Sequence, residues 1–247
     1  FTLGRERLGI VGESGSGKTT LGRMILRIVE PSSGKIAYRG RPDAAPMDVT
    51  TLSKVDLRRY HQDVRLIFQD PFASLNPRMT VKQIIGDPLV IAGGMSGKAV
   101  ETRVGERLQK VGLDPLAMER SPHAFSGGQR HRIGIARALA VNPKVIVADE
   151  PTSALDVSIR SQILDLLLDI QKQLNLSFIF ISHDISVVRY FCDRVAVMHK
   201  GKIVEIGDAE TICTTPSQPY TKRLISSVPN PDPRNKRMLH RLRANQV

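Results

Sequence analysis

The sequence has few of the features that mark membrane-spanning, metal-clustered or single-strand-binding proteins. It contains 247 residues, no tryptophan and only 4% aromatic residues. Bases of single-stranded nucleic acid stack on aromatic side chains placed among basic ones, so a single-strand binder is not expected. The two cysteines, Cys192 and Cys213, lack the spacing of metal ligands and are expected to be thiols in a reducing compartment. No apolar run approaches the roughly 18–20 residues that span a bilayer.

The first residues of the sequence carry no pattern that predicts a secretory signal. The chain begins at Phe1 without an initiator methionine and without a basic segment followed by an apolar one, so no secretory signal is predicted. Residues 1–3 (Phe-Thr-Leu) look like part of a strand. We therefore expect that an upstream part of the protein is missing from this sequence.

Acidic residues are outnumbered, because 36 basic and 24 acidic side chains give a formal net charge of +12. Such a charge permits nucleic-acid binding, proximity to anionic lipid or recognition of polyphosphate. Part of the excess is local: no acid follows Asp232, whereas several arginines and lysines do. A disordered, solvated tail is the preferred interpretation, and charge alone identifies no partner.

Residues 12–19 read Gly-Glu-Ser-Gly-Ser-Gly-Lys-Thr and match the phosphate-binding pattern G-x-x-x-x-G-K-[ST] at every fixed position. An apolar run at 8–11 predicts a strand before the motif, and residues 20–26 predict a helix after it. Glycines let the backbone N–H groups form an anion nest at the helix N-terminus. Lys18 is expected to reach the β- and γ-phosphates, and the Thr19 hydroxyl to ligate Mg²⁺. A glycine-rich turn alone does not explain the Lys-Thr pair, so the sequence predicts nucleoside triphosphate binding.

Apolar strands alternate with helices along most of the chain. Strands are expected at residues 35–38, 64–69, 145–148, 178–181, 195–198 and 203–205, and helices at 19–29, 81–85, 98–111, 128–141 and 158–174. This alternation predicts an α/β fold with a buried, mainly parallel sheet and right-handed crossovers. A polar surface excursion is expected at residues 41–60. The expected organisation is an α/β core of residues 1–70 and 127–207, an inserted helical subdomain of residues 71–126, and a C-terminal appendage with a basic tail over residues 208–247.

Two acids follow a buried strand, Asp149 and Glu150. Asp149 is placed to hold Mg²⁺, because a hard cation prefers carboxylate oxygen. Glu150 could act as the general base for an attacking water, an effect worth about 10²–10⁴-fold. The pair could instead cap a helix, but beside the phosphate loop the metal-and-base interpretation is favoured.

The segment Phe125-Ser126-Gly127-Gly128-Gln129 forms a second candidate anion site, with a hydroxyl and backbone N–H groups opening a helix. A helix N-cap explains Ser126 but not the double glycine followed by Gln129. The segment resembles the signature motif of ATP-binding cassette (ABC) ATPases, which usually has Leu where this chain has Phe125. In that family the signature contacts the γ-phosphate of ATP held by the other subunit. The resemblance therefore implies a head-to-tail dimer with two composite sites.

Further elements of that family occur in order along nearly the whole chain, and the resemblance implies a fold with a P-loop NTPase core. Gln69 is similar to the glutamine that touches Mg²⁺ and water and joins the helical lobe. Residues 153–156 resemble the loop at the dimer seam, and His183 resembles the histidine that bonds the γ-phosphate. The expected catalytic residues are Glu150 and His183, and the expected Mg²⁺ ligands are Thr19, Gln69 and Asp149. The residues expected to bind ATP are Gly12, Glu13, Ser14, Gly15, Ser16, Gly17, Lys18, Thr19, Thr20, Gln69, Ser126, Gly127, Gly128 and Gln129.

The chain departs from the family pattern at two further places. The aromatic residue that stacks on adenine normally lies upstream of the phosphate loop, in strands that this sequence lacks. His131 stands where the helix after the signature usually has Gln.

Two stretches resemble the branch that imports oligopeptides, dipeptides and nickel: residues 70–78 and residues 216–224, where Gln218 replaces the usual His. The resemblance implies an ATPase subunit at the cytoplasmic face of the inner membrane. Its expected partners are an identical or homologous ATPase subunit, two membrane permease subunits and, indirectly, a solute-binding protein. Some members hold an iron–sulfur centre in the appendage, but no cysteine follows Cys213, so none is predicted.

Three other functions fit part of the sequence less well than this one. A cassette ATPase that acts on nucleic acid would suit the positive charge, but such proteins usually have a long coiled coil between the phosphate loop and the signature. A non-catalytic regulatory subunit would not need both Glu150 and His183. A small-molecule kinase would not need the signature. The sequence therefore predicts a peptide-type importer ATPase with no nucleic-acid partner.

Overall fold

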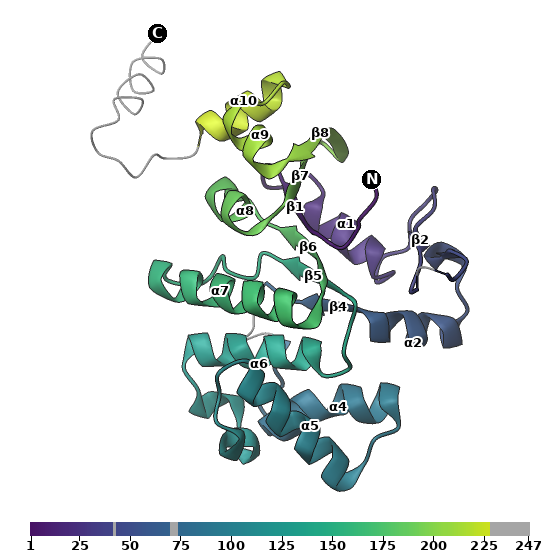
Figure 1. Ribbon diagram of the computed structural model, residues 1–247, viewed down its shortest axis with the longest axis vertical. Helices are drawn as coiled ribbons and strands as arrows, with labels where there is room; N and C mark the ends of the chain where they lie inside the picture. The colour runs from purple at the N-terminus through teal and green to yellow at the C-terminus, as the bar shows by residue number, and fades with distance from the viewer. Residues whose placement is uncertain (42, 70–73, 228–247) are drawn as a thin grey trace.

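A computed structural model describes residues 1–41, 43–69 and 74–227 (Figure 1). Its centre is a six-stranded sheet in the order β4-β5-β6-β1-β7-β8. Neighbouring strands from β4 to β7 pair in parallel, and β8 pairs antiparallel with β7. The strands of this sheet are β1 (Arg7–Val11), β4 (Val64–Ile67), β5 (Val145–Asp149), β6 (Ser177–Ile181), β7 (Arg194–His199) and β8 (Lys202–Asp208). The predicted α/β fold with a mainly parallel sheet is confirmed.

Both faces of the sheet are buried, which is why its strands are apolar throughout. In β6, Phe178 and Phe180 belong to one hydrophobic cluster, whereas Ile179 and Ile181 belong to a second. Successive side chains of a strand point to opposite faces, so the two clusters cover opposite faces of the sheet. The second cluster includes residues of α1 (Lys18–Ile25) and α2 (Lys54–Asp63), and the first includes residues of α6 (Gly127–Leu139), α7 (Val157–Leu174) and α8 (Ile185–Phe191).

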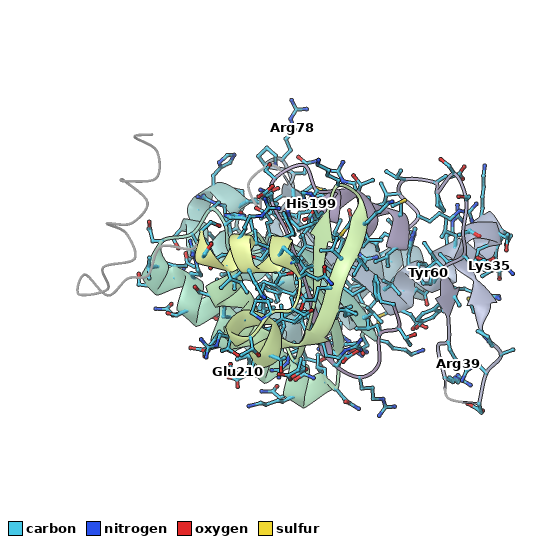
Figure 2. All side chains as sticks on the ribbon, turned by 90° about the horizontal axis from the view of Figure 1, so that it is seen from above. Lys35, Arg39, Tyr60, Arg78, His199 and Glu210 are labelled. Atoms are coloured by element: carbon cyan, nitrogen blue, oxygen red, sulfur yellow. The ribbon has the colours of Figure 1, made fainter. Side chains whose placement is uncertain are left out.

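A small antiparallel pair, β2 (Ala37–Tyr38) with β3 (Met47–Asp48), lies apart from the main sheet and is followed by the 3₁₀ helix η1 (Val49–Thr51). Seen from above, Lys35 and Arg39, which flank β2, lie on the same side as Tyr60 of α2 and away from Glu210 (Figure 2). This part of the chain therefore extends the molecule on the α1–α2 side.

A helical group lies at one end of the molecule, next to α6 (Figure 1). It consists of α4 (Val81–Gly93), α5 (Gly97–Lys110), η2 (Pro115–Glu119) and η3 (Pro122–Ala124). Val100, Val104 and Leu108 recur every fourth residue along α5 and are buried. That spacing places them on one helix face, which packs towards α4 and α6.

At the other end, β7 and β8 form the expected hairpin through Lys200 and Gly201, which both have positive φ values of 46° and 77°. The chain continues into α9 (Ala209–Thr214) and α10 (Pro219–Ser226). Among the described residues, no helix is both long enough and apolar enough to cross a lipid bilayer. The expected basic tail and the start of the branch-specific stretch, residues 70–73, lie outside the described residues.

Three expectations about local structure were wrong or incomplete. Residues 1–6 form no strand, and Leu3 instead packs against the cluster on the α1–α2 side. The described residues of 41–60 lie mostly at the surface, as expected, but they also form β3 and most of α2, whose sequence is mostly polar because only Tyr60 of this helix is buried. The helix expected to stop at Ile85 continues through Pro88 to Gly93, since apolar residues on both sides of the proline pack into the core.

Candidate functional site

The loop between β1 and α1, residues 12–17, carries the phosphate-binding motif. Gly17 is the N-cap of α1 and has a φ of 98°, in the left-handed region that favours glycine. At Gly12 the loop passes so close to β7 that a Cβ atom would lie 2.2 Å from the carbonyl oxygen of Met198. A glycine loop that opens into a helix N-terminus directs backbone N–H groups and a positive dipole at a bound anion.

The side chain of Lys18 is folded into this loop. Its ammonium group donates to the carbonyl oxygens of Gly12 and Glu13, each 2.9 Å away, and the residue is 5% exposed. Burial lowers the pKa of Lys18, while the nearby Glu150 and Asp149 act in the opposite direction. The loop therefore holds a buried positive charge beside two carboxyl groups.

Asp149 ends β5 next to the first turn of α1. The Thr19 hydroxyl donates to Asp149 Oδ1 over 3.1 Å. Burial raises the pKa of Asp149, and the hydrogen bond from Thr19 opposes that rise. Two of the three expected metal ligands are thus in contact, and both offer oxygen to a hard cation.

Glu150 follows directly and takes an unusual backbone conformation, with a φ of 46°. Residues other than glycine rarely adopt this left-handed region. Backbone strain from such conformations is concentrated at functional sites. Gln69 Nε2 donates to Glu150 Oε2 over 3.2 Å, and His183 Nδ1 lies 3.1 Å from Glu150 Oε1. The structure therefore brings together three predicted residues that follow three different strands.

One cavity of about 510 Å³ joins these groups to the phosphate loop. The expected residues Gly12, Glu13 and Ser16 belong to the loop but do not line the cavity. Asp149 does not line it either and reaches the site through its hydrogen bond from Thr19. Among the described residues, the lining consists of Ser14, Gly15, Gly17, Lys18, Thr19, Thr20, Gln69, Glu150 and His183.

The signature residues Ser126, Gly127, Gly128 and Gln129 do not line this cavity and lie at the N-terminus of α6. The Gln129 N–H donates to Ser126 Oγ over 3.3 Å, and the Ser126 N–H donates to Gln129 Oε1 over 2.9 Å. These bonds form a capping box. The expectation that helix capping accounts for Ser126 alone was therefore wrong, because Gln129 is its reciprocal partner.

His131, two residues further along α6, is 2% exposed. Burial lowers its pKa to about 4, so the ring is neutral at neutral pH. This departure from the family pattern is accommodated as a buried residue of α6.

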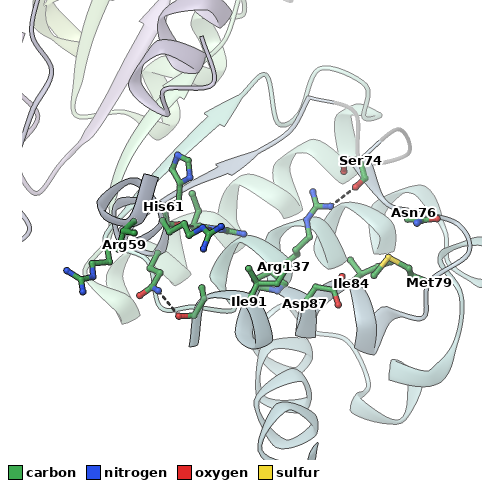
Figure 3. Close-up of a pocket in the computed structure, with 15 residues that line it drawn as sticks. Arg59, His61, Ser74, Asn76, Met79, Ile84, Asp87, Ile91 and Arg137 are labelled. Carbon is green, nitrogen blue, oxygen red and sulfur yellow. Dashed lines mark hydrogen bonds between the residues drawn. The ribbon is translucent and has the colours of Figure 1, made fainter. Parts of the chain in front are cut away.

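A second cavity, a groove of about 540 Å³, lies between α2 and α4 (Figure 3). We call it the α2–α4 groove. Arginines line it on the α2 side and beneath it: Arg58, Arg59, Arg65 and Arg137. Met79, Ile84, Pro88 and Ile91 add an apolar wall, and Asp87 is the acid among the described lining residues. Burial lowers the pKa of Arg137, and so does the neighbouring charge of Arg65.

Sequence reasoning missed this groove because its walls come from three separate segments of the chain. It also missed a contact between Tyr220 of α10 and the phosphate loop, where the Glu13 N–H donates to the Tyr220 hydroxyl over 3.2 Å. The branch-specific stretch that contains Tyr220 was the available signal, but nothing in it indicated the partner.

Comparison with known proteins gives matches to both ends of the chain. A family described as "ABC transporter" matches residues 3–153, and one described as "Oligopeptide/dipeptide transporter, C-terminal region" matches residues 204–247.

Two relatives share about half of their aligned residues with this chain. The dipeptide transport ATP-binding protein DppF of Lactococcus lactis subsp. cremoris is 52% identical over 235 residues, which cover 94% of this chain and 73% of DppF. The glutathione import ATP-binding protein GsiA of Escherichia coli O6:H1 is 50% identical over 232 residues, which cover 94% of this chain and 36% of GsiA. A solved dimeric ATP-binding cassette, in a post-hydrolysis state with ADP and phosphate, superposes with a TM-score of 0.73 at 30% identity over 85% of this chain and 88% of that one.

We expect Asp149→Asn to increase the free energy of unfolding of the nucleotide-free protein at neutral pH. Burial penalises the ionised carboxylate in the folded chain only, whereas asparagine is neutral and still offers an oxygen to Thr19. The penalty is present above the raised pKa of folded Asp149 and is lost as the pH falls through that pKa. Urea midpoints of the two proteins should therefore differ at neutral pH and converge below the ordinary carboxyl pKa of about 4.

The matched control is Asp169→Asn, an exposed aspartate on α7, for which the midpoint should stay unchanged. An Asp149→Asn protein that is less stable than the wild type at neutral pH would contradict this account of the buried carboxyl group.

Proposed function

Because this chain belongs to the family of ABC transporter ATPases, we propose that it is the ATP-hydrolysing subunit of an importer for peptides or a related small solute. The observation that carries the proposal is the meeting of Gln69, Glu150 and His183 at the cavity of the phosphate loop. A turn that only closed a strand–helix connection would not require a carboxylate, an amide and an imidazole from three other strand ends.

The C-terminal match and the relatives support peptides as the solute class. Residues 204–247 match the C-terminal region of oligopeptide and dipeptide transporters, and the two relatives are named for dipeptide transport and glutathione import. A separate solute-binding protein and the membrane subunits would select the solute itself. These comparisons give no support to the alternative of a nucleic-acid ATPase.

The phosphate loop, Gly12 to Thr20, would hold the triphosphate of ATP through backbone N–H groups and the ammonium group of Lys18. Lys18 would exchange its bonds to the Gly12 and Glu13 carbonyls for bonds to the phosphates. Thr19, Gln69 and Asp149 would hold Mg²⁺ through hydroxyl, amide and carboxylate oxygens, the ligand types that this ion prefers. When bound, the ion would neutralise charge on the phosphates.

Glu150 would act as the general base that takes a proton from the attacking water. Gln69 and His183 flank its two carboxylate oxygens and would fix their direction. The His183 side chain is 59% accessible, compared with 17% for Glu150, so it would be free to turn towards the γ-phosphate. Enzymes catalyse phosphoryl transfer almost entirely by positioning the reacting groups and by electrostatic stabilisation of the transition state.

A second subunit would complete the site. Residues 126–129 lie away from the cavity at an exposed helix N-terminus, and the solved cassette that this chain resembles is a dimer. In a head-to-tail dimer, these residues of one subunit would face the phosphate loop of the other. The partner would be an identical chain or a homologous ATPase.

The remaining surfaces would connect the ATPase to the membrane. We take residues 1–70 and 127–207 as the nucleotide-binding core, 71–126 as the helical subdomain and 208–247 as the C-terminal appendage. Two permease subunits would dock against the helical subdomain, with the α2–α4 groove as their site on each ATPase (Figure 3). The arginines and the apolar wall of this groove fit an acidic, amphipathic segment. The subunit would thus lie at the cytoplasmic face of the membrane as a peripheral protein.

Lys18→Ala should lower the rate of ATP hydrolysis by at least about 100-fold, because the positive charge of Lys18 would stabilise the negative charge on the γ-phosphate in the transition state. The assay is steady-state phosphate release with the partner subunits present. Lys172→Ala removes an exposed lysine of α7 and should leave the rate unchanged. Near wild-type turnover in Lys18→Ala would refute the assignment of the loop.

Glu150→Gln should keep the shape of the site but stop hydrolysis after ATP has been bound between two subunits. An ATP-dependent dimer should then accumulate and dissociate when only ADP is supplied, as measured by size-exclusion chromatography with light scattering.

A second substitution tests whether the signature closes this dimer. A Cβ atom at Gly127 would meet no atom within 4 Å, so Gly127→Glu is compatible with the fold. Its carboxylate would repel the γ-phosphate, and Glu150→Gln/Gly127→Glu should stay monomeric. A dimer that persists in the double variant would exclude the signature from the interface.

Arg59→Glu in the α2–α4 groove should leave ATP affinity within about twofold but lower coupled transport by roughly tenfold, because an acidic partner segment would face a like charge. Solute uptake and ATP hydrolysis are compared in vesicles that contain the whole transporter. Lys172→Glu makes the same charge change on α7, outside both cavities, and should have no effect. Equal loss of nucleotide affinity and transport in Arg59→Glu would argue against docking at this groove.

A further inference from the structure

Helix α10 is fixed to the nucleotide-binding core at its N-cap, Gln218, and at the residue before it. Glu205 of β8 accepts hydrogen bonds from the Ser217 N–H and the Ser217 hydroxyl, both over 2.7 Å, and from the Gln218 N–H over 3.2 Å. Partial burial alone would raise the pKa of Glu205, but the hydrogen bonds that it accepts outweigh this and lower the pKa. The carboxylate therefore caps α10 as a charged group and sets the position of the residues that follow.

Tyr220 is the residue that this cap brings to the phosphate loop. Its ring packs against His199 at the end of β7, with ring centroids 3.9 Å apart and the ring planes tilted by 38°. Its hydroxyl accepts a hydrogen bond from the Glu13 N–H over 3.2 Å, and the residue is 8% exposed. The side chain thus links the C-terminal segment to a loop that lies 207 positions earlier in the chain.

The peptide between Gly12 and Glu13 occupies a central place in the loop. Its carbonyl, that of Gly12, accepts a hydrogen bond from the Lys18 ammonium group over 2.9 Å. Once Lys18 turns to the phosphates of ATP, this carbonyl loses that bond. The bond from the Glu13 N–H to Tyr220 would then hold the same peptide from the other side.

Backbone atoms of the β7–β8 hairpin also reach this loop. Gly12 packs against the carbonyl of Met198, and the Gly201 N–H donates to the Ser16 carbonyl over 3.0 Å. Within the described residues, Tyr220 is the side chain beyond β8 that bonds to the loop backbone. It is therefore the contact that a change in the C-terminal segment can alter.

We propose that Tyr220 is a positioning residue of the phosphate loop, through which the C-terminal segment sets the affinity for ATP. The inference rests on the proposed role of the loop as the nucleotide site. The Tyr220 hydroxyl keeps the Gly12–Glu13 peptide in the orientation that the loop needs when Lys18 has left it. Because the hydroxyl contacts neither the phosphates nor Glu150, its effect falls on binding and not on the chemical step.

Tyr220→Phe separates this role from simple packing, because it removes the hydroxyl and keeps the ring against His199. We expect the Kd for a fluorescent ATP analogue, titrated into the full chain, to rise about three- to tenfold, as the loss of one hydrogen bond predicts. The kcat at saturating ATP, measured with the partner subunits, should stay within about twofold.

The matched control is Tyr60→Phe. Tyr60 is also buried, and its hydroxyl donates to the Ile25 carbonyl over 2.7 Å. Figure 2 shows Tyr60 well apart from His199. This variant should keep the wild-type Kd. An unchanged Kd in Tyr220→Phe, or an equal rise in both variants, would overturn the proposal.

A double-mutant cycle tests whether Glu205 acts through Tyr220. Glu205→Gln weakens the cap of α10 and should raise the Kd roughly twofold in the wild type but not in Tyr220→Phe, because the two changes then share one contact. Additive effects on the Kd would exclude that route. Lys18→Ala tests the role of the loop as the nucleotide site separately from the role of Tyr220. If that variant kept its ATP affinity and turnover, the assignment of the loop itself would be refuted, whatever the effect of Tyr220→Phe.

Discussion

The parallel alignment of β4, β5, β6 and β1 is the constraint on which the whole site depends. Strands that run in one direction end at one edge of the sheet, so the residues that follow them meet there. Gln69, Glu150 and His183 come together for this reason, beside the loop that follows β1. Such a sheet needs both faces covered, and the two hydrophobic clusters provide that cover.

The site gathers charges at positions where burial disfavours them. The pKa of Lys18 is lowered and that of Asp149 is raised, so each is shifted towards its neutral form. Glu150 adds a left-handed backbone conformation that such a residue rarely adopts. The surrounding structure maintains these unfavourable features, and under the proposed function a bound triphosphate with its metal ion would supply the charges that compensate for them. Stability is given up here in favour of binding and catalysis.

The phosphate loop also lies between two regions at opposite ends of the molecule (Figure 1). On one side, Gln69 follows β4 and precedes the helical group that contains α4 and α5. On the other, the β7–β8 hairpin and α10 contact the loop directly. A change in the loop therefore has a structural route to the α2–α4 groove and another to the C-terminal segment. This arrangement suits a subunit that has to transmit the state of its nucleotide to partner proteins.

The sequence by itself determined the phosphate loop, the strand-end acids and the α/β fold, because a glycine-rich motif and apolar runs are local and periodic signals. Local patterns did not predict α2, because the sequence of this helix, which Ser53 caps, is mostly polar. They predicted a strand at residues 1–3, where Leu3 packs against the core without forming one. The local patterns also did not show that Gln129 forms a capping box with Ser126, although the two residues are only three positions apart. Only the tertiary structure decided that Glu150 lies between Gln69 and His183. It alone also brought arginines from α2, β4 and α6 to one groove, and Tyr220 to the backbone of Glu13. Contacts between residues far apart in the chain depend on how sheet and helices pack, and no local pattern in the sequence records that packing.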